Sequence, residues 1–168
     1  MSNAANLSNP NPRALLDEVT QFIYREARLQ DDHAYDEWEN LWTNDGIYWI
    51  PANGEGTDPE NEMSIIYDNR SRISLRIKQF HTGKRFSQAP RSRLRRIVSN
   101  IEILGQDEKL LRVTSNAMVF ESSMRGDTIW ASRNEYHLRR EGQDLRMVLK
   151  KVILVNNETA LHSMAFLI

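Results

Sequence analysis

Residues 24–51, YREARLQDDHAYDEWENLWTNDGIYWIP, form the stretch that decides the fold. Apolar side chains recur in it at helical intervals, in two runs that the polar residues 31–33 (DDH) separate. Residues 44–46 (NDG) then supply the chemistry of a turn, and the aromatic and β-branched residues 47–50 follow as one short strand. Two helices that lead into an aromatic strand need a further surface to cover their apolar faces.

The first helix is expected over residues 13–29, because Pro12 suits a helix N-terminus, and the second over residues 33–43. Residues 1–12 are rich in Asn, Ser and Ala, and we expect them to be a flexible N-terminal tail. Residues 13–168 are then long enough to bury a core as a single domain.

From residue 95 onward the apolar pattern changes to period two. It forms four strand-like runs that short Gly-containing turns separate: residues 95–104, 110–122, 128–139 and 145–155. Such short connections allow only antiparallel neighbours, because a parallel crossover needs a dozen or more residues. Helices followed by an antiparallel meander predict an α+β fold, in which the N-terminal helices pack on a curved antiparallel sheet.

Residues 64–80 fit two patterns. Ile73, Leu75 and Ile77 alternate as in a strand, whereas Ile73, Ile77 and Phe80 have the spacing of a helix face. We favour a helix that begins near Asp68, whose carboxylate would cap it. The flanking residues 51–62 and 81–90 are expected to be loops.

The composition excludes several kinds of site. The chain has no cysteine, which excludes disulfides, thiolate zinc sites and cysteine-ligated iron–sulfur clusters on it and is typical of a cytoplasmic protein. No apolar run approaches the roughly 18 residues of a membrane span. A basic stretch with Phe80 and Phe86 nearby is compatible with RNA binding, but the net charge of −1 provides no overall attraction to nucleic acid. We expect neither a membrane nor a nucleic-acid partner.

Charge is nevertheless unevenly distributed along the chain. Residues 17–45 hold nine acidic side chains against two arginines, whereas residues 69–101 hold ten basic side chains and no acidic one. Such a split indicates either a docking surface or ion pairs between the basic stretch and the acidic helices.

Several motifs, in a fixed order, cover nearly the whole chain from about residue 13. They are residues 24–29 (YREARL), 31–32 (DD), Trp38, 48–51 (YWIP), 66–70 (IYDNR), 92–100 (SRLRRIVSN), 132–135 (SRNE) and 150–154 (KKVIL). In this order they resemble the small (β) subunits of aromatic-ring-hydroxylating dioxygenases, which are Rieske non-haem iron oxygenases. The resemblance implies a cone-shaped fold of the nuclear-transport-factor-2-like (SnoaL-like) type.

The resemblance also implies a function. The chain would be a non-catalytic subunit that is needed for the assembly and stability of an oxygenase. That oxygenase would add both atoms of O2 to an aromatic ring and give a cis-dihydrodiol. The partner would be a large (α) subunit that carries the Rieske [2Fe-2S] cluster and a mononuclear Fe(II), in a hexamer of three large and three small chains. No catalytic, cofactor-binding or metal-binding residue is then expected on the small chain.

Three positions depart from the family pattern. Residues 89–91 (APR) replace the usual double proline, Phe86 stands where tryptophan is frequent, and residues 155–157 (VNN) replace a more acidic ending. The last departure, together with residues 63–70, indicates the benzoate-type branch rather than the naphthalene or biphenyl branch.

The histidines, like the missing cysteines, provide no local motif for an iron site on this chain. A non-haem oxygenase iron needs two His and one carboxylate, and this chain offers no His pair at i, i+4 spacing. The four histidines are scattered: His33, His81, His137 and His162.

An alternative function remains open, because cone folds of this type also host free-standing dehydratases and isomerases. Candidate acid–base residues would then be Asp31, Asp32, His33, Tyr48 and His81, with His137 as a further possibility. We favour the structural interpretation, in which Asp31 and Asp32 end one helix and cap the next while the aromatic residues fill the core.

The basic stretch supplies candidates for contacts between subunits, namely Arg91, Arg93, Arg95 and Arg96. Guanidinium groups form bidentate bonds to carboxylates and are enriched at interfaces. Some of them could instead pair internally with Glu26 or Asp32.

Two further expectations concern packing. Trp38, Trp42, Tyr48 and Trp49 are expected in the core. Strands near residues 130–139 and 150–155 are expected to contribute to a trimer of small subunits.

Overall fold

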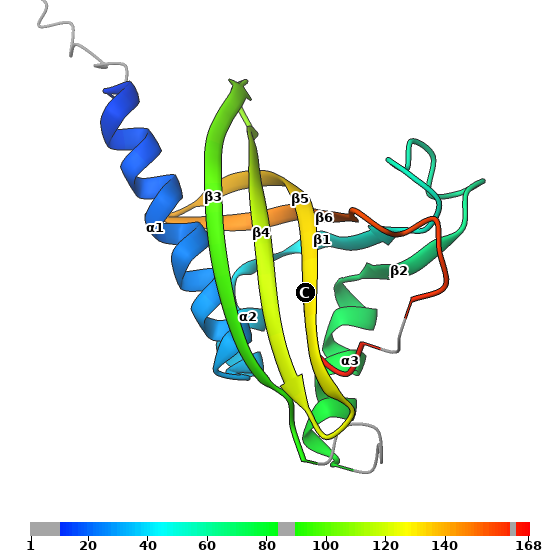
Figure 1. Cartoon of the computed structure of the whole chain (residues 1–168). Coiled ribbons are helices and arrows are strands. Elements are labelled where there is room, and N and C mark those ends of the chain that lie inside the picture. Colours follow the sequence, from blue (N-terminus) through cyan, green and yellow to red (C-terminus); the bar gives the residue numbers. More distant parts are fainter. Residues whose placement is uncertain (1–10, 84–89, 162–163) are drawn as a thin grey trace, which may run out of the picture.

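The computed structural model describes residues 11–83, 90–161 and 164–168, in which three helices pack against one curved sheet (Figure 1). The helices are α1 (Pro12–Asp31), α2 (Tyr35–Glu39) and α3 (Arg70–His81). The strands are β1 (Trp42–Pro51), β2 (Ser64–Asn69), β3 (Arg93–Gln106), β4 (Leu111–Ser123), β5 (Gly126–Glu141) and β6 (Asp144–Leu154). Of the expected flexible tail, residues 1–10 lie outside the described residues. Pro12 already belongs to α1, which Asn11 caps by accepting from the Arg13 N–H at 3.0 Å.

The six strands form one sheet in the order β2-β1-β6-β5-β4-β3. The predicted antiparallel meander is confirmed for β3 to β6, and β1 also pairs with β2 in antiparallel register. One pairing differs from the expected antiparallel sheet, because β1 runs parallel to β6. Most of the chain separates these two strands, which leaves ample length for the crossover that a parallel pair requires. The α+β cone is therefore built on a mixed sheet.

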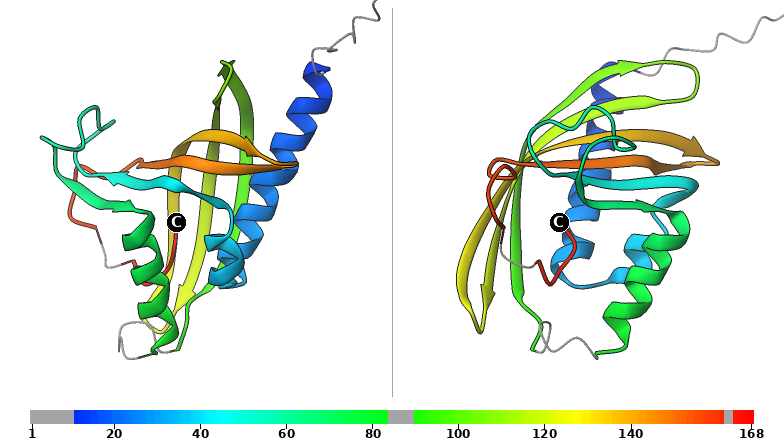
Figure 2. Two further views of the ribbon diagram at one scale, coloured as in Figure 1. Left: turned by 180° about the vertical axis from the view of Figure 1, so that it is seen from behind. Right: turned by 90° about the vertical axis from the view of Figure 1, so that its right-hand side faces the viewer.

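The sheet curls around the helices. In Figure 1 the outer face of β3, β4 and β5 is turned to the viewer, and the helices lie behind them. The side view in Figure 2 shows the helices on the side toward which the sheet bends, with the C-terminus between them and the sheet. The sheet thus has an inner face that the helices cover and an outer face that none of the three described helices covers.

The second helix is shorter than predicted. The prediction of residues 33–43 was wrong at both ends, since α2 covers only Tyr35–Glu39 and Trp42 already pairs with Met147 of β6. The Met147 N–H donates to the Leu41 carbonyl at 2.7 Å, so tertiary pairing outweighs the helical spacing of these aromatic residues.

The predicted turn at residues 44–46 lies inside β1 as an irregularity, because the register with β6 shifts between Trp42 and Ile47. Gly46 is required there. A Cβ atom at this position would lie 2.7 Å from Cε3 of Trp42 and 3.1 Å from the Thr43 carbonyl oxygen. The chain approaches itself too closely for any other residue.

The favoured helix is confirmed, because α3 includes Ile73, Ile77 and Phe80, whereas residues 64–69 form the strand β2, which was not predicted. The predicted cap was wrong by one residue, because Asn69 rather than Asp68 caps α3, accepting from the Arg72 N–H at 3.1 Å. Asp68 instead accepts from Nε of Arg76 at 2.6 Å, about two helical turns further along. The predicted loop at 81–90 includes residues 84–89, which lie outside the described residues.

The core lies between the helices and the inner face of the sheet, and it includes the C-terminal residues. The predicted core residues Trp38, Trp42, Tyr48 and Trp49 are all buried, which confirms that expectation. Trp38, Trp42 and Tyr48 belong to one hydrophobic cluster, which also contains Phe166, Leu167 and Ile168. The last described residues therefore fill the cone from within.

Candidate functional site

A charged cluster lies inside the cone, between α1 and β6. Nζ of Lys150 donates to Oε1 of Glu26 at 2.8 Å and to Oε1 of Gln30 at 3.1 Å. Nε1 of Trp38 donates to the same Glu26 oxygen at 2.7 Å. Desolvation by burial lowers the pKa of Lys150. Because Lys150 and Glu26 are each about 1% exposed and pair with each other, they bind α1 to the sheet rather than face a ligand.

Tyr48 is the deepest of the candidate acid–base residues. Its hydroxyl donates to the Ile168 main-chain oxygen at 2.6 Å and accepts from the Ile168 N–H at 3.1 Å. Burial raises the pKa of this tyrosine, so it stays protonated and both sides of its hydroxyl are occupied. The main chain of Ile168 therefore occupies the hydroxyl of Tyr48.

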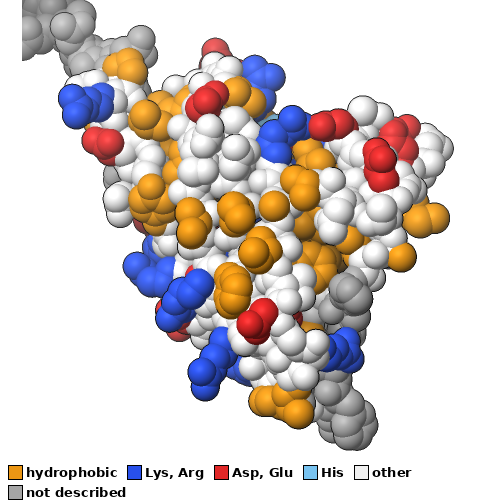
Figure 3. Space-filling view, viewed as in Figure 1, with side chains coloured by type: hydrophobic (Ala, Val, Ile, Leu, Met, Phe, Trp, Pro, Cys, Tyr) orange, Lys and Arg blue, Asp and Glu red, His pale blue; other side chains and the backbone are white. Residues whose placement is uncertain are grey.

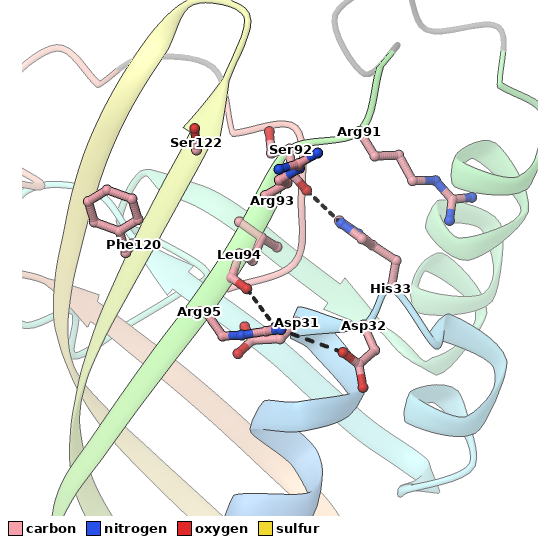
Figure 4. A pocket seen from close by; sticks show the side chains of 10 residues that line it. All are labelled: Asp31, Asp32, His33, Arg91, Ser92, Arg93, Leu94, Arg95, Phe120 and Ser122. Carbon is pink, nitrogen blue, oxygen red and sulfur yellow. Dashed lines mark hydrogen bonds and ion pairs between the residues drawn. The ribbon is translucent and has the colours of Figure 1, made fainter.

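A groove of about 650 Å³ opens at the end of α1, against the first residues of β3 (Figure 4). Its lining residues come from the α1–α2 junction, from residues 91–95 and from β4: Asp31, Asp32, His33, Arg91, Ser92, Arg93, Leu94, Arg95, Phe120 and Ser122. The structure therefore brings three candidate acid–base residues and three candidate interface arginines into one groove.

His33 is held by two bonds at the edge of this groove. Its Nδ1 lies 2.6 Å from the Tyr35 hydroxyl oxygen, and its Nε2 lies 2.8 Å from the Ser92 carbonyl oxygen. Both ring nitrogens are occupied by groups of the chain, and the backbone φ of 54° places His33 in the left-handed region. Burial raises the pKa of Tyr35 to about 12, with Arg91 and Arg96 opposing the effect. His33 therefore acts as a structural link between the helices and β3.

Ser92 offers no nucleophile to this histidine. Its hydroxyl donates to Oε1 of Glu121 at 2.6 Å, while Nε1 of Trp130 donates to Oε2 of the same carboxylate at 2.9 Å. Since His33 contacts the Ser92 carbonyl rather than its hydroxyl, the base and the hydroxyl are not in the arrangement that nucleophilic catalysis needs.

Asp31 and Arg96 form a buried pair. The Asp31 carboxylate accepts from the Arg96 main-chain N–H at 2.8 Å and from the Arg96 guanidinium, which also donates to the Leu167 carbonyl. The Arg96 side chain is only 3% exposed. Arg96 therefore pairs internally, with Asp31 rather than with Glu26 or Asp32, and its guanidinium faces the C-terminal residues.

The other three candidate arginines are exposed. Arg95 lies 3.9 Å from Asp32 at its nearest atoms and is 78% exposed. Arg91 lies over the Tyr35 ring at 5.8 Å, and neither Arg91 nor Arg93 forms an ion pair with the residues that the structure describes. All three side chains are therefore exposed, although Arg95 also donates to the Leu94 carbonyl at 3.1 Å.

The remaining candidates lie outside the groove. Nε2 of His81 pairs with Asp36 at 2.8 Å at the surface, and half-buried His137 stands on β5, where burial lowers its pKa. His162 is not among the described residues. The candidate acid–base residues therefore do not converge, because Tyr48 is bonded inside the cone and His81 pairs with Asp36.

No group of three or more His, Asp and Glu side chains arranged to hold a metal ion occurs within residues 11–83, 90–161 and 164–168. Over the same residues, no helix combines the length and the apolarity that crossing a membrane requires.

One surface was missed by the sequence analysis, namely the outward side of β3, β4 and β5. Ile97, Met118, Phe120 and Ile129 are all exposed there, by between 48% and 71%. The uninterrupted apolar run at residues 117–120 was the available signal. In a strand with one solvent-exposed face, apolar and polar residues should alternate instead.

Comparison with known proteins places the chain in a family. The family described as "Ring hydroxylating beta subunit" matches residues 25–160. The benzoate 1,2-dioxygenase subunit beta of Acinetobacter baylyi is 27% identical over 157 residues, which cover 88% of this chain and 93% of that protein. The small oxygenase component of the p-cumate 2,3-dioxygenase system of Pseudomonas putida is 30% identical over 139 residues, or 82% of this chain and 77% of that protein.

Solved structures agree on the fold. The beta subunit of a benzoate 1,2-dioxygenase from Burkholderia mallei superposes with a TM-score of 0.73 at 23% identity, covering 90% of this chain and 95% of that one. A putative scytalone dehydratase from Novosphingobium aromaticivorans superposes with a TM-score of 0.65 at 14% identity, covering 92% of each chain. The second likeness concerns the cone fold alone, whereas the family match spans most of the sequence. The chain belongs to the ring-hydroxylating beta-subunit family, the small subunits of aromatic-ring dioxygenases.

Proposed function

We propose that this chain is the non-catalytic small subunit of a multicomponent aromatic-ring-hydroxylating dioxygenase and that it is needed for the assembly and stability of the oxygenase. The observation that carries the proposal is the filled cone. The family match spans residues 25–160, and within that length Tyr48, Lys150 and Glu26 are bonded to the chain's own groups. An oxidoreductase complex would then use this chain as a support.

The redox groups belong on a partner in this proposal. A Rieske cluster needs two cysteine and two histidine ligands, and none of the 168 residues is cysteine. The residues of this chain therefore do not fit that cluster. The large (α) subunit would carry the Rieske [2Fe-2S] cluster and the mononuclear Fe(II), with electrons supplied from NADH through a reductase. This chain would carry no cofactor.

The proposed assembly is a cytoplasmic hexamer of three large and three small chains, in which the small chains contact one another as a trimer. Exposed Arg91, Arg93 and Arg95 remain candidates for contacts that cross between subunits, since guanidinium groups suit polar interfaces. The strands near residues 130–139 and 150–155 remain candidates for trimer contacts.

Several relatives support a benzoate-type substrate class. They include the small subunit of a 2-halobenzoate 1,2-dioxygenase from Burkholderia cepacia at 26% identity and the toluate 1,2-dioxygenase subunit beta of Pseudomonas putida at 28%. We propose that the complete oxygenase adds O2 to an aromatic carboxylate and forms a cis-dihydrodiol.

The alternative, a free-standing dehydratase or isomerase, gains no support from the site. Four of its five proposed acid–base residues, Asp31, His33, Tyr48 and His81, are bonded to other groups of the chain. The likeness to the scytalone dehydratase concerns the fold, and fold alone assigns no activity.

The test is co-expression of an affinity-tagged form of this chain with the large oxygenase subunit of a benzoate-type system. We expect the two chains to co-purify, with a mass that fits three copies of each by light scattering. We also expect benzoate-dependent oxygen uptake once NADH and reductase are added. A large subunit that is equally stable and active without this chain would overturn the proposal, as would turnover of a hydroxylated aromatic by this chain alone.

A further inference from the structure

The uncovered outer face of the sheet is apolar at its centre. Ile97 lies opposite Met118 in the β3–β4 register, and Phe120 lies opposite Ile129 in the β4–β5 register, so the four side chains form one continuous patch. Figure 3 shows hydrophobic side chains gathered across the middle of this face. We call these four residues the outer patch. A contiguous apolar patch of this kind marks an interaction site rather than scattered surface residues.

The outer patch has a basic border. Arg93 and Arg95 point to the same face as Ile97, because all three alternate with the buried residue Leu94 and the buried side chain of Arg96 along β3. The carboxylates nearby are few: Asp32 lies 3.9 Å from Arg95, and Asp127 stands at the start of β5. A partner for this surface should therefore present apolar and acidic groups together.

This chain carries such a surface itself. Residues 52–63, between β1 and β2, contain Glu55, Asp58, Glu60 and Glu62 and no lysine or arginine. Met63 follows with 72% of its surface exposed, and Ile65 on the edge strand β2 is 38% exposed. We call residues 52–65 the acidic segment. It unites negative charge with exposed apolar side chains at the edge of the sheet.

The acidic segment is an ordered part of the fold. The Glu62 carboxylate accepts from the Thr57 N–H at 2.9 Å and from the Thr57 hydroxyl at 2.7 Å, and the Asn157 amide donates to the Gly54 carbonyl at 2.7 Å. Glu55 pairs with Arg133 on β5. Glu60 has no such side-chain bond to the described residues, so its charge is available to another molecule.

We propose that the outer patch of one copy of this chain docks against the acidic segment of a second copy. The inference deepens the proposed small-subunit trimer, on which it rests, by naming the two surfaces that meet. Two outer patches facing each other would bring Arg93 and Arg95 of both copies together, and two acidic segments would likewise repel. Opposite charges favour the contact between unlike surfaces.

The consequence is a head-to-tail assembly. When two copies meet through two different surfaces, the pair still has one unused outer patch and one unused acidic segment. Each further copy can therefore add by the same contact until a ring closes. In Figure 3, acidic side chains lie on the same side of the molecule as the hydrophobic patch, beside it rather than on it. Neighbouring patches on one side of a subunit allow three copies to meet around a common axis.

The first experiment exchanges charges across the contact. Arg93→Glu with Arg95→Glu, and separately Glu60→Arg, should each weaken self-association by about tenfold or more, measured by sedimentation of the tagged complex and of the free chain. The combined variant, with all three changes in one chain, should regain most of the lost association. Arg13→Glu, an equal charge reversal near the start of α1, is the matched control and should leave association unchanged.

The second experiment uses the absence of cysteine in this chain. In the co-purified complex, a bis-maleimide reagent should crosslink one small chain of the Met63→Cys/Met118→Cys variant to another. Each single variant should give few crosslinked small chains. Efficient joining of Met118→Cys to itself, or of Met118→Cys to the large chain, would overturn the proposal, as would charge variants that associate like the parent chain. Co-purification with the large chain is scored separately, so loss of that partner would refute the proposed function instead.

Discussion

Nζ of Lys150 and Oε1 of Glu26 lie 2.8 Å apart in a pair whose side chains are each only 2% exposed, which joins the last strand to the first helix. A buried pair of this kind costs a large desolvation energy. The mutual attraction, the hydrogen bond that Trp38 donates to Glu26 and the one that Gln30 accepts from Lys150 offset this cost. The pair therefore specifies how α1 sits on the sheet more than it adds net stability.

Lys150→Met should lower the free energy of unfolding by about 3–5 kcal/mol, because it leaves the Glu26 carboxylate buried without a cation. The double variant Lys150→Met/Glu26→Gln removes both charges and keeps an acceptor for Trp38, so it should recover most of the loss. Urea unfolding followed by tryptophan fluorescence measures both. A single variant as stable as the parent chain would mean that the pair is open to water.

Two neighbouring arginines should behave differently. Arg96→Ala should cost about 3–5 kcal/mol of unfolding free energy, because Asp31 stays buried and loses its partner. Arg95→Ala removes an exposed contact at 3.9 Å and a hydrogen bond to the carbonyl of the neighbouring Leu94, and it should change stability by less than about 1 kcal/mol. Thermal and urea unfolding of the two variants provide the comparison. Equal losses would contradict the division between an internal and an external arginine.

Gly46→Ala should be destabilising by about 1–3 kcal/mol, since the added methyl group would lie 2.7 Å from the Trp42 ring. Gly105→Ala is the matched control. Its Cβ atom would meet only the far end of the Arg112 side chain, at 2.9 Å, which can move away. The urea midpoints of the two variants should therefore separate clearly, and a neutral Gly46→Ala would show that the β1 irregularity has room to adjust.

Tyr48→Phe tests the role of the deepest tyrosine. Removal of the hydroxyl leaves the Ile168 N–H and main-chain oxygen without partners inside the core, at a cost of about 1–3 kcal/mol. Oxygen uptake per assembled complex should not change, because Tyr48 supports the fold. A large loss of turnover in a complex that assembles normally would instead favour the acid–base alternative.

The ion pair between Asp45 and Arg139 predicts that the stability of the fold depends on pH in the acid range. Hydrogen bonds from Arg139, then from Thr43, lower the pKa of Asp45 from 3.8 to about 2. The folded state thus binds fewer protons than the unfolded state between these values. The contribution of Asp45 is then complete above pH 3.8 and disappears as the pH falls toward about 2.

Since the Asp45 side chain is 60% exposed, its contribution should stay below about 1 kcal/mol. Asp45→Asn should show a shallower loss of urea stability across this range than the parent chain. Parallel pH profiles for the two proteins would exclude the contribution.

The sequence by itself determined the elements whose signals are local. The strands β3 to β6 followed from alternation and from short Gly-containing turns, which leave only an antiparallel meander, and α1 followed from its apolar spacing and from Pro12. The absence of cysteine and the ordered motifs were also available before any coordinates, and the family match bears out the resemblance that they carried.

Tertiary structure alone decided the features that depend on residues far apart in the chain. Trp42 has helical spacing, yet it joins β1 because the Met147 backbone supplies a partner more than a hundred residues away. Arg96 and Arg95 are neighbours in the sequence, yet strand alternation and the position of Asp31 bury one and expose the other. No local pattern carries this information, because burial and pairing depend on where the sheet brings distant side chains together.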